Sequence, residues 1–111
     1  MSRQYIYVIC EQTDSNTALK IGFSGEPEKR LKQLQTAQSN ALVLYHQEEV
    51  VPENVRALER IIHKTLKHHK ARGEWFHLKP DEAVAEIKHA IMRYGDIEEL
   101  ALKLRGGSNR V

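Results

Sequence analysis

Two short segments near the start of this chain alternate between apolar and polar residues, and no other feature constrains the fold as strongly. A period of two is typical of a strand that buries one face. In the first segment, Ile6, Val8 and Cys10 share one face, whereas Tyr5 and Tyr7 share the other. This segment is therefore predicted to be a half-buried strand.

The second segment, residues 19–24, shows the same alternation. Pairing the two segments as a hairpin across the polar loop of residues 11–17 would merge their apolar faces into one core. The opposite face would be open and would carry phenols, an ammonium group, a hydroxyl group and a glycine, which suits an anionic ligand. The two faces of the second segment consist of Leu19, Ile21 and Phe23 and of Lys20, Gly22 and Ser24.

Beyond the hairpin, the sequence predicts a helix and a third strand. Pro27 is typical of a helix start, and this helix is expected to end near Thr36. Residues 41–48 alternate again and are predicted to form a strand. One face of this strand is expected to carry Leu42, Leu44 and His46.

The second half of the chain is predicted to be mainly helical. The longest helix is expected to run from Val51-Pro52-Glu53 to about Lys70, because apolar residues recur at intervals of three and four. An extended segment with two aromatic residues follows over residues 74–78, and helices are expected over 80–95 and 96–104. The apolar stripe of the longest helix consists of Val55, Leu58, Ile62 and Leu66.

Together these elements predict an α+β fold: a small three-stranded, mostly antiparallel sheet flanked by helices, with additional C-terminal helices. The 111 residues are expected to form one domain over residues 1–105, with a core at about 4–78 and a helical extension at about 80–105. Residues 106–111 are expected to be a flexible tail.

Composition excludes several classes of protein. No apolar run approaches the ~20 residues that a membrane-spanning helix needs, and Met1 to Gln4 lack the apolar stretch of a secretory signal. We therefore expect no membrane partner and a cytoplasmic location in a bacterial or phage-infected cell, or a nuclear one in a eukaryote. The single cysteine, Cys10, excludes an intramolecular disulfide and a cysteine-rich zinc finger.

Charge is unevenly distributed, although the net charge is only +2. Residues 56–72 hold six lysines and arginines but one acid, Glu59, whereas residues 80–104 hold six acids and three bases. A basic middle beside an acidic end can direct phosphate groups to one side of the molecule.

Four blocks of residues, in order, resemble the GIY-YIG endonuclease superfamily, and in particular its branch typified by a phage T5 DNA-binding domain. Tyr5-Ile6-Tyr7 stands at the first strand motif, with tyrosine in place of the first glycine. Lys20-Ile21-Gly22 stands at the second, with the lysine that is usual in this branch in place of tyrosine. The later blocks of the branch match Arg30 on the first helix, Glu59 with His63 on the longest helix, and Glu74-Trp75-Phe76.

This resemblance implies a divalent-metal-dependent DNA endonuclease that hydrolyses phosphodiester bonds and nicks one strand per active site. Tyr7 would activate or position the attacking water, and Arg30 would clamp the transition state. Lys20 would act as a fixed positive charge on the phosphate or as an acid for the leaving oxygen. His63 would contact Glu59 or the phosphate, or assist proton transfer. The resemblance thus implies catalytic roles for Tyr7, Lys20, Arg30, Glu59 and His63.

The resemblance also implies that Glu59 binds one hard divalent ion, Mg²⁺ with Mn²⁺ as a substitute, because a single carboxylate leaves the other positions to water and phosphate oxygens. Most superfamily members also carry an asparagine late in the site. This chain has no asparagine between Asn54 and Asn109, and Glu74 is the nearest candidate for that place. DNA, expected to be double-stranded, would contact Tyr5, Lys20, Arg30, Arg60, Lys64 and Lys67.

Two alternatives stay open at the level of the sequence. Lysine at position 20 and the missing asparagine favour a non-catalytic DNA-binding module of the same fold. A protein-interaction domain would account for the apolar C-terminal helices but would leave the polar hairpin face without a role. The chain is expected to act as a monomer or a homodimer, and stand-alone nucleases of this kind occur in phages, mobile elements and their hosts.

Overall fold

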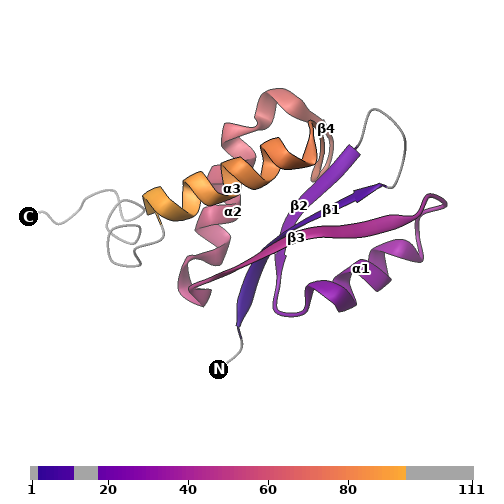
Figure 1. Cartoon of the computed structure of the whole chain (residues 1–111), viewed down its shortest axis with the longest axis horizontal. Coiled ribbons are helices and arrows are strands. Elements are labelled where there is room, and N and C mark those ends of the chain that lie inside the picture. Colours follow the sequence, from indigo (N-terminus) through magenta and orange to yellow (C-terminus); the bar gives the residue numbers. More distant parts are fainter. Residues whose placement is uncertain (1–2, 12–17, 95–111) are drawn as a thin grey trace, which may run out of the picture.

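In a computed structural model, residues 3–11 and 18–94 of the protein form an α+β fold with one five-stranded antiparallel sheet (Figure 1). The strand order is β3-β1-β2-β5-β4. The strands are β1 (Gln4–Glu11), β2 (Ala18–Ser24), β3 (Leu42–Val50), β4 (Lys70–Arg72) and β5 (Trp75–His77). The α-helices are α1 (Pro27–Gln35), α2 (Val55–Thr65) and α3 (Pro80–Tyr94), and 3₁₀ helices at Pro52–Asn54 and Lys67–His69 flank α2.

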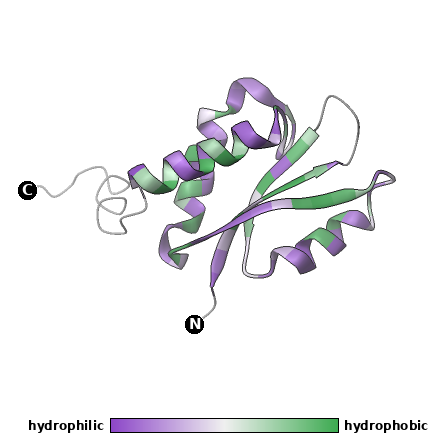
Figure 2. Ribbon diagram, in the orientation of Figure 1, coloured by the Kyte–Doolittle hydropathy of each residue, from purple (hydrophilic) through white to green (hydrophobic). Residues whose placement is uncertain are grey.

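The predicted hairpin of β1 and β2 is present. The strands pair antiparallel, with Tyr7 opposite Gly22 and Ile9 opposite Lys20. Their apolar face lies under α2 and α3 and forms the main core with the predicted stripe of α2. Hydrophobic and hydrophilic residues alternate along the helices (Figure 2), as expected of elements that bury one side.

The opposite face of the hairpin is not open, contrary to the prediction. α1 packs on it through Leu31 and Leu34, and Tyr7 and Ile9 are buried beneath this helix. Helices therefore lie on both sides of the sheet, α1 on one side and α2 with α3 on the other (Figure 1). The alternation of residues shows which face Tyr7 occupies but does not show whether a helix covers that face, because a tyrosine tolerates both burial and exposure.

The sheet has five strands among the described residues, not the predicted three. α2 ends at Thr65 and not near Lys70, and the residues after the following 3₁₀ helix form β4, which pairs with β5. Gly73 turns the chain between these strands with a φ of +57°, a conformation that glycine adopts without strain. The basic stretch after Leu66 carries no apolar periodicity, so strand pairing and not helix propensity decides its structure.

A β-bulge between Val8 and Ile9 shifts the register between β1 and β3. Ile9 pairs with Leu44 on the α1 face, whereas Val8 pairs with His46 on the α2 and α3 face. The prediction that His46 shares a face with Leu42 and Leu44 is therefore wrong, because one extra residue reverses the side on which the following side chains lie.

α3 begins at Pro80 as predicted. The predicted helix over residues 96–104 and the predicted tail lie outside the described residues. Of the helices that the structure describes, none combines the length and the apolar character needed to cross a bilayer.

Candidate active site

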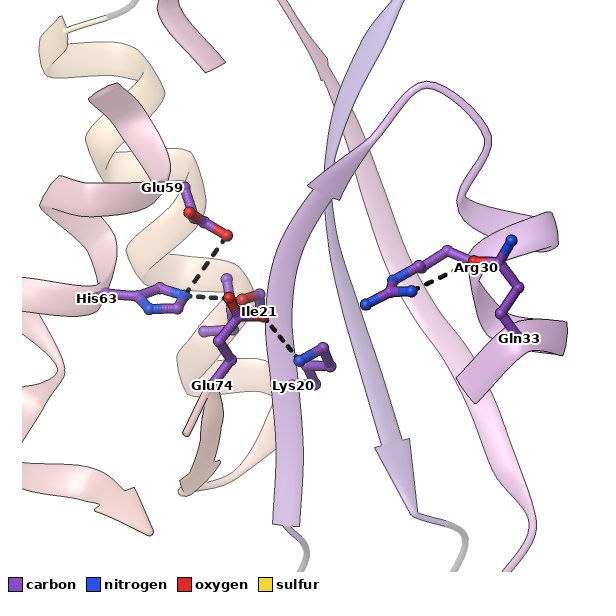
Figure 3. Close-up of polar contacts among 7 residues, drawn as sticks. All are labelled: Lys20, Ile21, Arg30, Gln33, Glu59, His63 and Glu74. Carbon is purple, nitrogen blue, oxygen red and sulfur yellow. Dashed lines mark hydrogen bonds and ion pairs between the residues drawn. The ribbon is translucent and has the colours of Figure 1, made fainter. Parts of the chain in front are cut away.

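The candidate site lies where the pairing between β2 and β5 stops, at Lys20 and Trp75. β5 pairs with β2 only from Ala18 to Lys20, and no other described strand pairs with the rest of this edge of β2. Glu59 and His63 approach this edge from α2, whereas Arg30 points toward β2 from α1 (Figure 3). The edge of one strand is thus the point at which side chains from both faces of the sheet can meet.

Gly22 makes room for the phenol of Tyr7, its partner across the hairpin. A Cβ atom at position 22 would lie 2.5 Å from the hydroxyl oxygen of Tyr7 and 2.7 Å from its Cζ atom. The glycine has no unusual backbone conformation, since Gly73 is the glycine with positive φ in the described part of the chain. Position 22 therefore needs glycine because the tyrosine ring contacts the strand backbone.

Tyr7 is a buried phenol beside a guanidinium group. Burial raises its pKa, and a hydrogen bond with the side chain of Arg30 lowers this pKa in part. Arg30 also donates from Nη1 to Oε1 of Gln33 at 3.3 Å, which orients it along α1. At neutral pH Tyr7 is therefore a neutral phenol next to the positive charge of Arg30.

Lys20 is a buried cation, with 7% of its surface exposed. Its Nζ atom donates to Oε1 of Glu74 at 2.7 Å (Figure 3), and this hydrogen bond is the main reason why the pKa of Glu74 lies below its usual range. A buried ammonium group without a partner would be costly, so Glu74 explains how a lysine can occupy this position. The sequence left the contribution of Glu74 open.

His63 connects α2 to the edge of β2. Its Nε2 atom lies 2.7 Å from the carbonyl oxygen of Ile21 and 3.9 Å from Oε2 of Glu59. Because a carbonyl oxygen only accepts hydrogen bonds, Nε2 carries the proton and donates it. The ring of Phe76 contacts the imidazole edge-on, with 4.9 Å between ring centroids, so two contacts define the position of His63.

Glu59 is half-buried, and its charge is only partly compensated. Burial raises the pKa of Glu59, and the charge of Glu74 raises it further, whereas His63, Lys20 and Arg56 lower it. A carboxylate in this environment gains stability from an added cation. Arg56, whose guanidinium carbon lies 5.6 Å from the centroid of Phe23, was not among the predicted site residues, although the sequence shows it one turn before Glu59.

We expect Glu74→Gln to lower the pKa of Glu59, because it removes a negative charge and frees Lys20 to compensate Glu59. The pKa can be followed by ¹³C NMR of the side-chain carboxyl group, with Glu86→Gln on α3 as a control that leaves it unchanged. A carboxyl group with a raised pKa holds its proton more tightly in the folded state. The contribution of Glu59 to the free energy of unfolding therefore falls as the pH rises from its unfolded-state pKa of about 4.3 through its higher folded-state pKa. An unchanged pKa in Glu74→Gln would show that the two acids do not interact.

Exposed cations continue outward from the site. Successive residues of a helix are rotated by ~100°, which places Arg60 and Lys64 farther from the buried stripe of α2 than Glu59 and His63. Lys67, in the 3₁₀ helix after α2, is exposed as well. Tyr5 is half-buried opposite Ser24, on the same face of β1 as Tyr7.

The predicted catalytic residues lie close enough to influence one another. The pKa of Tyr7 responds to Arg30, Glu74 and Glu59, and the pKa of Glu59 responds to His63 and Lys20. No group of three or more His, Cys, Asp or Glu side chains within residues 3–11 and 18–94 could hold a metal ion. A cation at Glu59 would therefore take most of its ligands from water and substrate.

The fold and this cluster define a small α+β domain with charged and polar side chains gathered beside β2. Residues 4–93 match the T5orf172 domain. The chain belongs to this family, which is related to the GIY-YIG/HNH-like nuclease superfamily and is associated with nucleic-acid interaction. The residues that match the family include α3 as far as Arg93. No curated protein and no solved structure matches the chain.

Proposed function

We propose that this domain is a DNA endonuclease that hydrolyses phosphodiester bonds with a divalent ion at Glu59 and nicks one strand per active site. The observation that supports the proposal is that a phenol, two cations and a carboxylate, from four elements around β2, lie close enough to influence one another's charge. Phosphodiester hydrolysis requires such groups, because negative charge develops on the phosphate and water must be positioned for attack.

The two cations suit different tasks. The guanidinium of Arg30 can hold two phosphate oxygens at once, which an ammonium group does less well. Lys20 presents a single charge whose position Glu74 determines. Because Glu74 is half-exposed, its carboxylate can move toward solvent when a phosphate oxygen takes its place beside Lys20.

Tyr7 and His63 suit positioning roles. The raised pKa of Tyr7 keeps its hydroxyl protonated, so that it cannot take a proton from water but can donate a hydrogen bond to water or phosphate. The Nε2 proton of His63 is engaged with Ile21, so this atom cannot also accept a proton from water. We propose that His63 orients Glu59 through the 3.9 Å contact between them.

Glu59 suits Mg²⁺, with Mn²⁺ as a substitute, because Mg²⁺ keeps several waters and binds through one or two carboxylates together with substrate phosphates. The incompletely compensated charge of Glu59 supports this assignment. When bound, the ion would stabilise charge on the phosphate and make a coordinated water more acidic.

A plasmid assay tests the proposal. With Mg²⁺ the purified protein should convert supercoiled DNA to the open-circular form, EDTA should stop the conversion, and Mn²⁺ should restore it. The ion pair of Lys20 with Glu74 favours an alternative, a DNA-binding module without catalysis, because it engages the ammonium group. Binding without cleavage in the presence of any divalent ion would establish that alternative.

We expect Lys64→Ala to weaken DNA binding at low salt and to reduce the slope of log K against log salt by about 1, because each phosphate contact releases about one counterion. Fluorescence anisotropy of a labelled duplex at several salt concentrations measures this slope. Lys88→Ala is the matched control, since Lys88 contacts Glu48 on the strand at the opposite edge of the sheet. Equal slopes for Lys64→Ala and wild type would remove the basic side of α2 from the DNA-binding surface.

A further inference from the structure

A cavity of about 380 Å³ lies on the α1 face of the sheet, outside the cluster at Glu59. α1 packs mainly on β3, β1 and β2, which leaves room beyond its C-terminal end, beside β5 and β4. The cavity volume is near the lower end of the range for small-molecule sites. The side chains that matter here are Glu11, Gln38, Arg72, Trp75 and His77.

Trp75 links this cavity to the candidate active site. It pairs with Lys20 across β2 and β5, and Nζ of Lys20 lies 5.9 Å from the centroid of its ring. Part of the ring packs against the core beneath α1, and another part lines the cavity. One fixed aromatic ring therefore separates the cavity from the buried cation that we assign to the phosphate.

The other lining groups add a cation and hydrogen-bonding groups beside this ring. Arg72 pairs with Trp75 across β4 and β5, and His77 is two residues from Trp75 and so on the same side of the strand. Arg72 and His77 are exposed. Gln38 offers an amide and Glu11 a carboxylate, groups that pair with the polar edges of bases. An aromatic ring, a guanidinium and an amide in one small cavity suit a flat, polar, aromatic ligand.

We propose that the cavity binds one unstacked base of the DNA strand whose phosphate lies at Lys20, and that the domain therefore prefers DNA with unpaired bases at the cleavage point. The proposal rests on the proposed function for the place of the phosphate. A base inside an intact duplex is stacked on both sides and cannot also stack on Trp75. Single-stranded, branched or distorted DNA presents such a base at lower cost.

Trp75 is the single tryptophan of the chain, so its fluorescence reports directly on this cavity. In EDTA, where no cleavage is expected, a short single-stranded oligonucleotide should quench the fluorescence. The same strand with abasic sites keeps every phosphate but lacks the bases, and it should bind about 5- to 100-fold more weakly without quenching. An intact duplex should quench less than the single strand. Equal quenching by the abasic strand would overturn the proposal, because phosphates alone would then account for the signal.

Variants test the same cavity without relying on fluorescence. Trp75→Phe should keep the preference for single-stranded over duplex DNA in an anisotropy assay, whereas Trp75→Ala should lose it. Since Trp75 also packs in the core, thermal melting should show that each variant is folded. Arg72→Ala changes an exposed residue and should independently lower the affinity for single-stranded DNA. Arg93→Ala, an exposed arginine on α3, is the matched control. Unchanged single-strand affinity in Arg72→Ala and in folded Trp75→Ala would overturn the proposal.

The outcomes separate this inference from the proposed function. Base-dependent quenching without plasmid nicking would place the base site on a DNA-binding module and reject only the nuclease. Nicking together with base-independent quenching would keep the nuclease and reject only the base site.

Discussion

Glu59→Gln should slow plasmid nicking by at least about 100-fold while leaving DNA affinity nearly unchanged. The change keeps the size and polarity of the side chain but removes the charge that we assign to the divalent ion. Glu59 is half-buried, and the other carboxylate that affects its pKa, Glu74, is hydrogen-bonded to Lys20. The nicking rate under single-turnover conditions and the anisotropy of a labelled duplex measure the two quantities separately.

A matched control makes this result specific to position 59. Glu53→Gln changes an exposed acid in the 3₁₀ helix just before α2, and it should leave both nicking and binding unchanged. Nicking by Glu59→Gln at the wild-type rate would show that the carboxylate does not hold an essential ion. Loss of binding together with nicking would instead indicate a structural role.

Gly22→Ala should destabilise the domain by about 1–3 kcal/mol, the usual cost of inserting a methyl group into a packed interior. The added Cβ would lie 2.5 Å from the hydroxyl oxygen of Tyr7, and Tyr7 is 1% exposed and has little space to move. For a domain of this size the melting temperature should fall by about 4–8 °C per kcal/mol. Urea unfolding measures the free energy directly.

A double-mutant cycle tests whether Tyr7 causes this cost. In a Tyr7→Leu background, which lacks the atoms that the new Cβ would meet, Gly22→Ala should cost much less. Equal costs in both backgrounds would mean that the clash with Tyr7 is not the reason for glycine at position 22. Because the added Cβ atom would displace the phenol of Tyr7, the Gly22→Ala variant should also nick plasmid DNA more slowly than the wild type.

The parts of the fold that the sequence predicted are those with a local periodic pattern. The alternation in β1 and β2 predicted the hairpin, and the apolar stripe of α2 predicted its buried side. β4 has three exposed residues and no apolar pattern, so its pairing with β5 could not be predicted locally. The bulge in β3, where Tyr45 is the extra residue, was hidden for a similar reason, because register depends on both strands and not on either alone.

The candidate site shows the same division. The resemblance indicated five catalytic candidates, but not how residues on opposite faces of a sheet could approach one another. These candidates are Tyr7, Lys20, Arg30, Glu59 and His63. The short pairing of β5 with β2, which stops at Lys20, makes this possible. The burial of Lys20 depends on a carboxylate 54 residues away; the resemblance placed Glu74 near the site, but no local pattern indicated its contact with Lys20.

The contact between His63 and Ile21 also affects whether another strand can pair with this edge of β2. An unpaired strand edge offers backbone groups to any extended chain, and proteins commonly block such edges. The imidazole already occupies the carbonyl at the first residue of β2 beyond its pairing with β5. An intruding strand would have to displace the imidazole before adding to the sheet, so this contact protects from a sixth strand the same edge that we propose for the phosphate.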